Sequence, residues 1–242
     1  MKAFILAAGL GTRLQPITDS KPKALVEING ITLLEFTIRR LIKFGFDQII
    51  INVHHFADQI INFLNEKNNF GIEIEISDER NLLLDTGGGL KKTSRFFSSK
   101  QPFLIHNVDI LSDADLAQFY NFHLNSDSIA TLAVQKRKSS RYFLFDEKNY
   151  LCGWENMKTD ERKITRQPVG KLTQLAFSGI HMADPSIFQL MPPEKVFSIV
   201  DFYLSIASQN RISYFDHSNS LFIDLGKKEN LAEAEKIFNN NF

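Results

Sequence analysis

Residues 1–30 read MKAFILAAGLGTRLQPITDSKPKALVEING, and this segment gives the clearest indication of the fold class. The apolar run from Ala3 to Leu6 predicts a buried strand, which leads directly into a loop that carries Gly9 and Gly11. Glycines leave backbone N–H groups uncovered, so such a loop can close around an anion or the edge of a base. A strand that ends in this kind of loop is typical of α/β proteins, which bind ligands beyond the carboxyl ends of their strands.

Strand and helix signals alternate through the first half of the chain. Apolar runs predict strands, and spacings of three and four between apolar residues predict helices. Such alternation implies right-handed crossovers and a mostly parallel sheet with helices on both faces. The predicted strands lie at 2–6, 48–53, 71–76, 102–109 and 129–134, and the predicted helices lie at 32–45, at 57–67, after the glycine triplet 87–89, and at 113–125.

The pattern changes after residue 134. Residues 135–180 mix short β-like pieces with turns and charges, which predicts a small β-rich insertion. A strand is predicted at 172–182, and helices are predicted at 184–191 and 196–210. Further segments follow at 211–216 and 220–226, the second of which contains a late strand at 220–224, and the last helix is predicted at 228–238. Because there is no Gly/Ser-rich linker and no internal repeat, we expect residues 1–242 to form one domain. The predicted class is α/β, with a Rossmann-like, mostly parallel sheet.

Composition limits the possible functions. The 242 residues are 43% hydrophobic, and 28 basic residues balance 28 acidic ones, which argues against a nucleic-acid partner bound through bulk charge. The single Cys152 excludes an internal disulfide and a cysteine-based zinc cluster. No apolar run approaches the roughly 18 residues of a membrane span, and the first run is too short for a signal peptide. We therefore expect a cytoplasmic enzyme or binding domain without a membrane partner.

Three interpretations of the first loop compete. A dinucleotide-binding loop requires a third glycine where Leu14 stands, and a Walker loop requires a Gly-Lys-Ser/Thr sequence that is absent. A tight turn with solvated lysines is the simplest alternative. The loop, however, combines uncovered backbone with the planar guanidinium of Arg13 and the compact charge of Lys23. Pro22 stiffens the backbone just before Lys23. Neighbouring phosphates need such neutralisation, so the combination favours a nucleoside triphosphate.

These residues carry a resemblance to a known family. LAAGLGTRLQPIT at 6–18, with PKAL at 22–25, resembles the signature L-A-A-G-x-G-T-R-L-x-P-x-T … P-K-x-L of the sugar-1-phosphate nucleotidyltransferases. LLDTGGGLKK at 83–92 is similar to the L-E-T-G-G-G segment of N-acetylmuramate-1-phosphate uridylyltransferases. FLIHNVDI at 103–110, FSGIHMADPSIF at 177–188 and FIDLGKKENLAEAE at 222–235 resemble the family segments F-L-x-x-N-G-D, F-[ST]-G-I and W-x-D-[VI]-G-T. The resemblance covers nearly the whole chain, whose length fits the short members without a C-terminal β-helix domain.

The resemblance implies a glycosyltransferase-A-like fold, a reaction and a set of site residues. A sugar-1-phosphate oxygen attacks the α-phosphate of a nucleoside triphosphate and releases pyrophosphate, so catalysis is positioning and charge neutralisation, with Arg13 and Lys23 as catalytic residues. Mg²⁺ is implied as cofactor, held by Asp109 and Asp224. The implied sugar-binding residues are Asn107 and Gly179, and the implied nucleotide-binding residues are Leu6, Ala7, Ala8, Gly9, Gly11, Thr12, Arg13, Lys23, Asp85, Gly87 and Gly88.

The resemblance of residues 83–92 favours UTP and N-acetylmuramate 1-phosphate as substrates, which implies a role in nucleotide-sugar biosynthesis for the cell wall. A guanylyltransferase acting on mannose or heptose 1-phosphate is the close alternative. A cytidylyltransferase acting on phosphocholine shares the opening motif but is not expected to share the later segments. A nucleotide-sugar-binding regulator without activity is the alternative from another class. The sequence does not determine the oligomeric state.

Two residues depart from the family motifs, and three others have two possible interpretations. Val108 stands where the family has glycine, and because valine does not easily adopt a positive φ, a different loop geometry is expected there. Lys227 stands where the family has threonine. Asn52 and His54 end the second strand and either face the base or are structural. Trp154 either stacks on a hexose or packs the insertion. The other histidines have no metal-ligand spacing, so we expect them to be structural or solvated.

Overall fold

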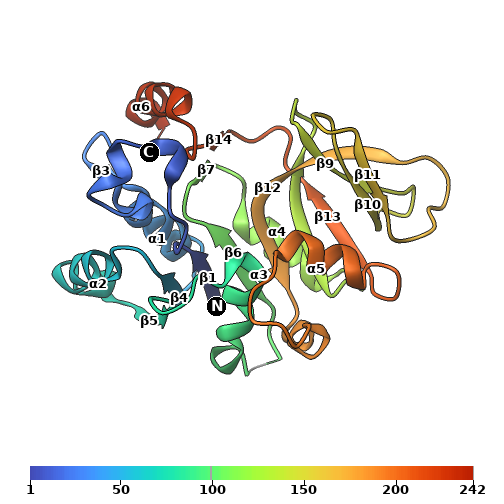
Figure 1. The fold of residues 1–242 in the computed structure, drawn as a ribbon, viewed down its shortest axis with the longest axis horizontal. Coiled ribbons are helices and arrows are strands. Elements are labelled where there is room, and N and C mark those ends of the chain that lie inside the picture. The colour runs from blue at the N-terminus through green and yellow to red at the C-terminus, as the bar shows by residue number, and fades with distance from the viewer. Residues whose placement is uncertain (99, 242) are drawn as a thin grey trace.

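The strand that leads into the glycine loop lies in the middle of the central sheet. The computed structural model describes residues 1–98 and 100–241 (Figure 1). In it β1 (Lys2–Leu6) pairs in parallel with β4 (Gln48–Val53) and with β6 (Phe103–Asn107). The register places Leu6 beside Asn52 on one side and beside Asn107 on the other. The carboxyl ends of these three strands therefore meet at one edge of the sheet, where ligands of α/β proteins bind.

Together with its outer strands, the central sheet is mixed but mostly parallel. On one side, β5 (Glu73–Asp78) continues the parallel part beside β4. On the other side, β12 (Thr173–Ala183) runs antiparallel between β6 and β8 (Ala130–Gln135), and β8 pairs in parallel with β13 (Ile212–Asp216). The predicted α/β class is confirmed.

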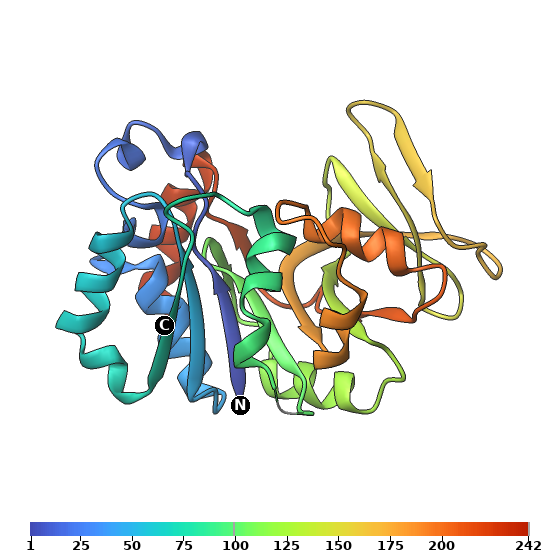
Figure 2. The ribbon, with the colours of Figure 1, turned by 60° about the horizontal axis from the view of Figure 1, so that its bottom comes forward.

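The long strand β12 connects the central sheet to the β-rich insertion. Its last residues pair with β6, whereas Thr173–Leu175 pair with the insertion, and the register shifts between Phe177 and His181. Figure 2 shows the N-terminal α/β part on the left and the insertion on the right. The insertion is an antiparallel meander of β9 (Arg141–Phe145), β10 (Leu151–Asn156) and β11 (Glu161–Ile164).

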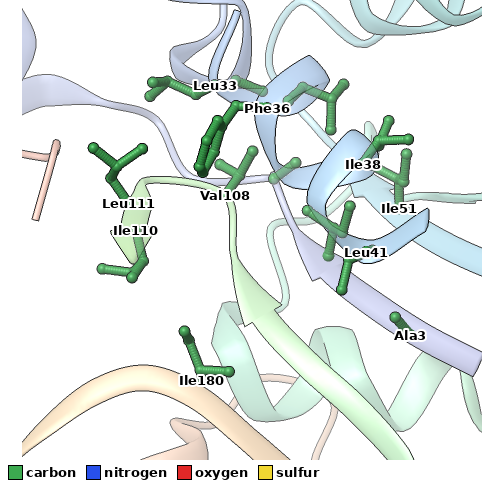
Figure 3. Packing of buried hydrophobic residues seen from close by; sticks show 14 of the residues in the cluster. Ala3, Leu33, Phe36, Ile38, Leu41, Ile51, Val108, Ile110, Leu111 and Ile180 are labelled. Carbon is green, nitrogen blue, oxygen red and sulfur yellow. The ribbon is translucent and has the colours of Figure 1, made fainter. Parts of the chain in front are cut away.

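Helices cover both faces of the sheet, because successive residues of β1 are buried on opposite faces. Ala3 and Ile5 belong to the hydrophobic cluster on one face, and Phe4 belongs to the cluster on the other face. Figure 3 shows the first cluster, where Ile38 and Leu41 of a helix lie over the sheet. The first face is covered by α1 (Leu33–Lys43), α2 (Ala57–Glu66), α4 (Leu116–Leu124) and α6 (Lys228–Asn241), and the second by α3 (Asp85–Lys92) and α5 (Ile199–Ile206).

Local sequence signals explain where the helices begin and end. Thr32 caps α1 by accepting a hydrogen bond from the Glu35 amide, a contact worth about 1 kcal/mol, and Gly45 follows with a φ of 81°. One predicted boundary was wrong: α3 begins at Asp85, so the glycine triplet forms the first turns of the helix instead of preceding it. The helix starts early because residues 195–199 pack against this end, as described below.

Two short ribbons join strands that are too short to show a hydrophobic period, and of these strands only the one that ends at Asp224 was predicted from the sequence. They pair β2 (Glu27–Ile28) with β3 (Ile31–Thr32) and β7 (Ile110–Ser112) with β14 (Phe222–Asp224). Short 3₁₀ helices occur at Thr12–Leu14, Ile17–Asp19, Lys23–Leu25, Asn68–Gly71, Ser94–Phe96 and Pro185–Leu190.

The C-terminal helix lies beside the N-terminal loop region. In Figure 1, α6 is next to β3, and the Asn29 side-chain amide donates a hydrogen bond of 2.8 Å to the carbonyl of Glu235. The segments that carry the first and the last family motif are therefore neighbours. Among the described residues, none of the helices has both the length and the apolar character that crossing a bilayer requires.

Candidate active site

Two cavities lie at the carboxyl ends of the strands. The smaller cavity, of about 390 Å³, is bordered by the loop after β1, the ends of β4 and β6, and the start of α3. The larger cavity, of about 1020 Å³, lies between the β14–α6 segment on one wall and β9 and β10 on the other. The predicted residues Arg13 and Asp224 line the larger cavity. The predicted residues that line the smaller one are Leu6, Ala7, Ala8, Gly9, Lys23, Asp85, Asn107 and Asp109.

Three predicted side chains converge on Gly226, which the sequence analysis did not select. A Cβ at this glycine would lie 2.8 Å from the Lys23 ammonium nitrogen and 2.9 Å from both Arg13 Nη2 and Asp109 Oδ2. A side chain at this position would fit only if the ends of these three side chains moved away. The motif FIDLG contains this residue, but only the fold reveals what surrounds it. Gly226 therefore marks the point at which the cations of the first loop meet the carboxylate that follows β6.

The β7–β14 ribbon brings the two predicted metal ligands together. Asp224 is paired with Ile110 in the ladder, and the Leu225 amide donates a 2.8 Å hydrogen bond to the carbonyl of Asp109. One carboxylate oxygen of Asp224 accepts a 2.9 Å hydrogen bond from the Gly226 amide. Asp109 forms an ion pair with Lys23, and both side chains are largely buried.

The donor set at this point fits Mg²⁺ better than a metal bound by protein ligands alone. Within the described residues there is no group of three or more histidine, cysteine, aspartate or glutamate side chains that would hold a metal ion. Mg²⁺ commonly takes one or two carboxylates and completes its shell with substrate phosphates and water. Two neighbouring aspartates beside two cations are compatible with that arrangement.

Asn52 and Glu79 form a buried polar pair behind the smaller cavity. Asn52 Oδ1 accepts hydrogen bonds from the amides of Ala7 at 2.7 Å and Ala8 at 3.2 Å, and its Nδ2 donates to Glu79 at 2.8 Å. The second oxygen of Glu79 accepts from the Leu84 amide at 3.2 Å, and burial raises the pKa of this carboxyl. The pair thus joins the first loop to the start of α3. Both side chains are buried and border the cavity, so Asn52 has a structural role at the wall of the candidate site.

The glycines of α3 are required by packing. The amides of Gly87 and Gly88 donate hydrogen bonds of 2.9 and 3.2 Å to the carbonyl of Phe197. A Cβ at Gly87 would lie 2.4 Å from the Phe197 ring, and one at Gly88 would lie 2.0 Å from the carbonyl oxygen of Lys195. Neither glycine is among the residues that line the smaller cavity. Asp85, at a φ of 60°, does line it.

The glycines of the first loop have two different reasons to be there. Gly11 has a φ of 68°, and a Cβ on it would lie 3.0 Å from Thr18, so the fold itself requires glycine. Gly9 lines the smaller cavity, and a Cβ on it would meet no described atom within 4 Å. The fold therefore leaves Gly9 free for close approach by a ligand. Thr12 begins a 3₁₀ helix, is exposed, and lies outside both cavity linings.

The two predicted sugar-binding residues are neighbours. A Cβ at Gly179, whose φ is 70°, would lie 2.7 Å from Nδ2 of Asn107. Between Asn107 and Asp109, Val108 has no positive φ, is buried in the first hydrophobic cluster, and donates a hydrogen bond from its amide to the Leu6 carbonyl at 3.2 Å. Figure 3 shows Val108 close to Phe36. Valine therefore needs no positive φ at this position. Lys227, the other residue that departs from the family motifs, lines the larger cavity.

The larger cavity holds functional candidates that the sequence analysis missed or left open. Arg137 donates a 2.8 Å hydrogen bond from Nη2 to the carbonyl of Phe177, and its guanidinium lies 4.2 Å from the centre of the Phe222 ring. Burial lowers the pKa of Arg137, although the charge of Asp224 opposes this shift. Trp154 packs against the second hydrophobic cluster and also lines the larger cavity, so both interpretations of this residue stay open. No sequence motif indicated Arg137, because it follows β8 in a run of basic residues.

Comparison with known proteins defines the class. The sequence model of the family described as nucleotidyl transferase matches residues 2–240, so the chain belongs to this family. A UTP–glucose-1-phosphate uridylyltransferase of Synechocystis sp. is 28% identical over 249 residues, which cover 97% of this chain but 62% of that relative. An N-acetylmuramate alpha-1-phosphate uridylyltransferase of Neisseria meningitidis serogroup B is 28% identical over 237 residues and matches 98% of each chain.

A solved structure confirms the fold. HddC from Yersinia pseudotuberculosis, in complex with GMP-PN, has a TM-score of 0.78 and is 24% identical, with coverage of 98% of this chain and 99% of that one. The curated relatives also include mannose-1-phosphate guanylyltransferases. The names of these relatives agree on sugar-1-phosphate nucleotidyl transfer and differ in the base and the sugar. The chain is accordingly an enzyme of this class.

Proposed function

We propose that this protein forms a nucleoside diphosphate sugar and pyrophosphate from a nucleoside triphosphate and a sugar 1-phosphate. The observation that supports the proposal most directly is the convergence of Arg13, Lys23 and Asp109 on Gly226, beside Asp224. This point adjoins both cavities, because Lys23 and Asp109 line the smaller one while Arg13 and Asp224 line the larger one. Phosphates from two substrates can meet there.

The two cavities suit two different substrates. The smaller cavity has uncovered backbone at Gly9 and the polar side chains of Asn52, Asp85 and Thr86, a combination suited to a nucleoside. The larger one is basic and contains an aromatic platform at Trp154, which suits a hexose phosphate. We assign Leu6, Ala7 and Ala8 to the wall of the nucleoside site, through the hydrogen bonds of the two alanines with Asn52.

In the proposed reaction an oxygen of the sugar 1-phosphate attacks the α-phosphorus. The bond from that phosphorus to the oxygen bridging to the β-phosphate breaks, and pyrophosphate leaves. Arg13 and Lys23 offset the charge that develops on the leaving group, and they also orient the triphosphate. Asp109 and Asp224 would hold Mg²⁺, which supplies further charge neutralisation at the phosphates when it is bound. Asn107 and Gly179 are assigned to the sugar side of the site.

We propose UTP and N-acetylmuramate 1-phosphate as the substrates. The likeness of LLDTGGGL to the uridylyltransferase segment supports this choice, as does the Neisseria relative that matches over 98% of both chains. A panel of UTP, GTP, CTP, ATP and dTTP tests it, with N-acetylmuramate, N-acetylglucosamine, glucose and mannose 1-phosphates as acceptors and pyrophosphate release as the readout. The fastest release is expected with UTP and N-acetylmuramate 1-phosphate.

Other results of the panel separate the alternatives. Faster release with GTP and mannose 1-phosphate would make the protein a guanylyltransferase and leave the proposed reaction intact. No release with any pair, together with measurable binding of a nucleotide sugar, would instead indicate a regulator without activity. Retention of Arg13, Lys23, Asp109 and Asp224 in one place weighs against that outcome, since a binding protein has no need for charge neutralisation at a leaving group.

A further inference from the structure

The larger cavity concentrates positive charge in a chain whose net charge is zero. Its acidic lining residues are Asp224 and Glu229, whereas its basic lining residues are Arg13, Arg137, Arg141, Lys158, Lys227 and Lys228. One sugar phosphate and the adjoining triphosphate account for the cations near Asp224. The remaining charge on the opposite wall needs a separate explanation.

Two of these cations belong to the β9–β11 meander. Arg141 is the first residue of β9 and is paired in the ladder with Asn156 of β10, while Lys158 is the second residue after β10. Both are exposed, and neither forms an ion pair with any described carboxylate. By contrast, Arg162 on the adjacent strand β11 lies 3.8 Å from Glu155. The uncompensated charge of the meander therefore faces the cavity.

The ladder also places an aromatic ring next to these cations. Trp154 is paired with Phe143, two residues along from the pair of Arg141 with Asn156, so the side chains of both pairs lie on one face of the β9–β10 hairpin. All four line the larger cavity. A hexose placed on this face would contact the indole, with its 1-phosphate towards Asp224 on the opposite side of the cavity and its ring substituents beside the two cations.

We propose that Arg141 and Lys158 bind a carboxylate carried by the hexose ring, so that the enzyme selects acidic sugar 1-phosphates over neutral ones. The inference rests on the proposed function and assigns residues to its sugar specificity. The guanidinium fork of Arg141 suits the two oxygens of a carboxylate, and the Lys158 ammonium adds a second charge-assisted contact. A neutral sugar would leave both cations unpaired, as they are in the free protein.

A matched pair of substrates tests the proposal. N-acetylmuramate 1-phosphate and N-acetylglucosamine 1-phosphate differ by the lactyl group that carries the carboxylate. With the preferred nucleotide and Mg²⁺ at saturation, the ratio of kcat/KM for the acidic over the neutral sugar is expected to exceed about tenfold in the unmodified protein. Arg141→Gln and Lys158→Gln should each lower this ratio by about fivefold to tenfold, mainly through the KM of the acidic sugar.

A control variant and the pattern of results separate failure of this inference from failure of the proposed function. Arg162→Gln removes the same charge from the same meander but outside the cavity, and the ratio should not change. Higher ionic strength should lower the ratio, because the two cations are exposed. Equal kcat/KM for both sugars, or an unchanged ratio in Arg141→Gln and Lys158→Gln, would overturn this inference alone. A preference for glucose 1,6-bisphosphate over N-acetylmuramate 1-phosphate would overturn the assignment to a carboxylate. No turnover with any sugar 1-phosphate would overturn the proposed function and this inference with it.

Discussion

The ammonium of Lys23 and the carboxylate of Asp109 form an ion pair in the wall of the smaller cavity. One residue follows the first loop and the other follows β6, so the contact joins two segments far apart in the chain. In the proposed reaction they have different partners: Lys23 takes a phosphate and Asp109 takes Mg²⁺. We expect binding of the nucleotide with its metal to weaken this ion pair. A phosphate that binds Lys23 leaves Asp109 available to the metal, and a metal that binds Asp109 leaves Lys23 available to the phosphate. The affinities for nucleotide and metal are therefore coupled.

Replacement of Lys23 should separate a catalytic role from a structural one. Lys23→Ala is expected to lower kcat by about 10²- to 10³-fold, the scale of losing one charge-stabilising contact at a transition state. Lys21→Ala is the matched control, because Lys21 precedes the same Pro22 but lies outside both cavity linings. Pyrophosphate release measures the rate, and thermal melting checks the fold. A Lys23→Ala protein as fast as the parent would contradict the assigned role.

The metal assignment predicts a requirement for a divalent cation. Activity should disappear in EDTA and return with Mg²⁺. Asp109→Asn and Asp224→Asn should each raise the Mg²⁺ concentration needed for half-maximal rate, because a neutral amide is a poorer ligand for a hard cation. Titration of the rate with Mg²⁺ measures this, and Asp113→Asn serves as a control outside both cavity linings. Normal turnover by the EDTA-treated enzyme would show that the assignment is wrong.

Two glycine substitutions should affect different kinetic constants. Gly226→Ala inserts a methyl group 2.8 to 2.9 Å from atoms of Lys23, Arg13 and Asp109, so it should displace these side chains and lower kcat. Gly9→Ala meets no described atom within 4 Å, so it should leave the melting temperature of the free protein unchanged and raise the KM for the nucleotide. Steady-state kinetics and thermal melting of both variants check this. An unaltered nucleotide KM in Gly9→Ala would exclude close approach at that residue.

Buried histidines should make the protein sensitive to acid. Burial lowers the pKa of His106 and His181 to about 3 and that of His123 and His217 to about 4, from an ordinary value of 6.5. Below about pH 6.5 the unfolded chain therefore binds protons that the folded chain does not bind. The free energy of unfolding should be highest above that pH and should fall as the pH drops towards 4, by up to about 1.4 kcal/mol per pH unit for each histidine.

Urea unfolding at several pH values between 7.5 and 4.5 measures this slope. The raised pKa of Glu79 acts in the opposite direction, since a carboxyl with a raised pKa favours the folded state at low pH, but it is one group against four. His181→Gln removes one titrating group and should make the slope shallower by about one proton. A slope that is the same with and without His181 would mean that this histidine is not neutral in the folded protein.

Much of the fold could be predicted from local sequence. The strand at 48–53 appears with those bounds, and the helix capped by Thr32 ends within two residues of Gly45. The period of apolar residues reports which face of an element is buried, so it identifies long elements well. The ribbon of β7 and β14 could not be found in this way, although a strand that ends at Asp224 was predicted. Its strands have three residues each, and tertiary pairing alone stabilises them.

The candidate site also has features that local sequence indicates and features that depend on tertiary structure. The sequence by itself determined the chemistry of the first loop, because Arg13, Lys23 and the glycines around them are close along the chain. It also indicated Asp109 and Asp224, through motifs at the ends of predicted strands. Only the tertiary structure decided that these side chains meet at Gly226, because their approach depends on the order of strands in the sheet and on the β7–β14 ladder.

The contacts of the residues around the first loop also depend on the tertiary structure. Asn52 holds Ala7 and Ala8 because β1 and β4 are adjacent and in register, and Glu79 reaches Asn52 because β5 lies next to β4. The basic wall of the larger cavity exists because the insertion folds back towards Asp224. Sequence determines which chemical groups are present and which local elements form, since both depend on neighbours along the chain. Distances between groups that are remote in sequence depend on packing, and packing is decided by the whole fold.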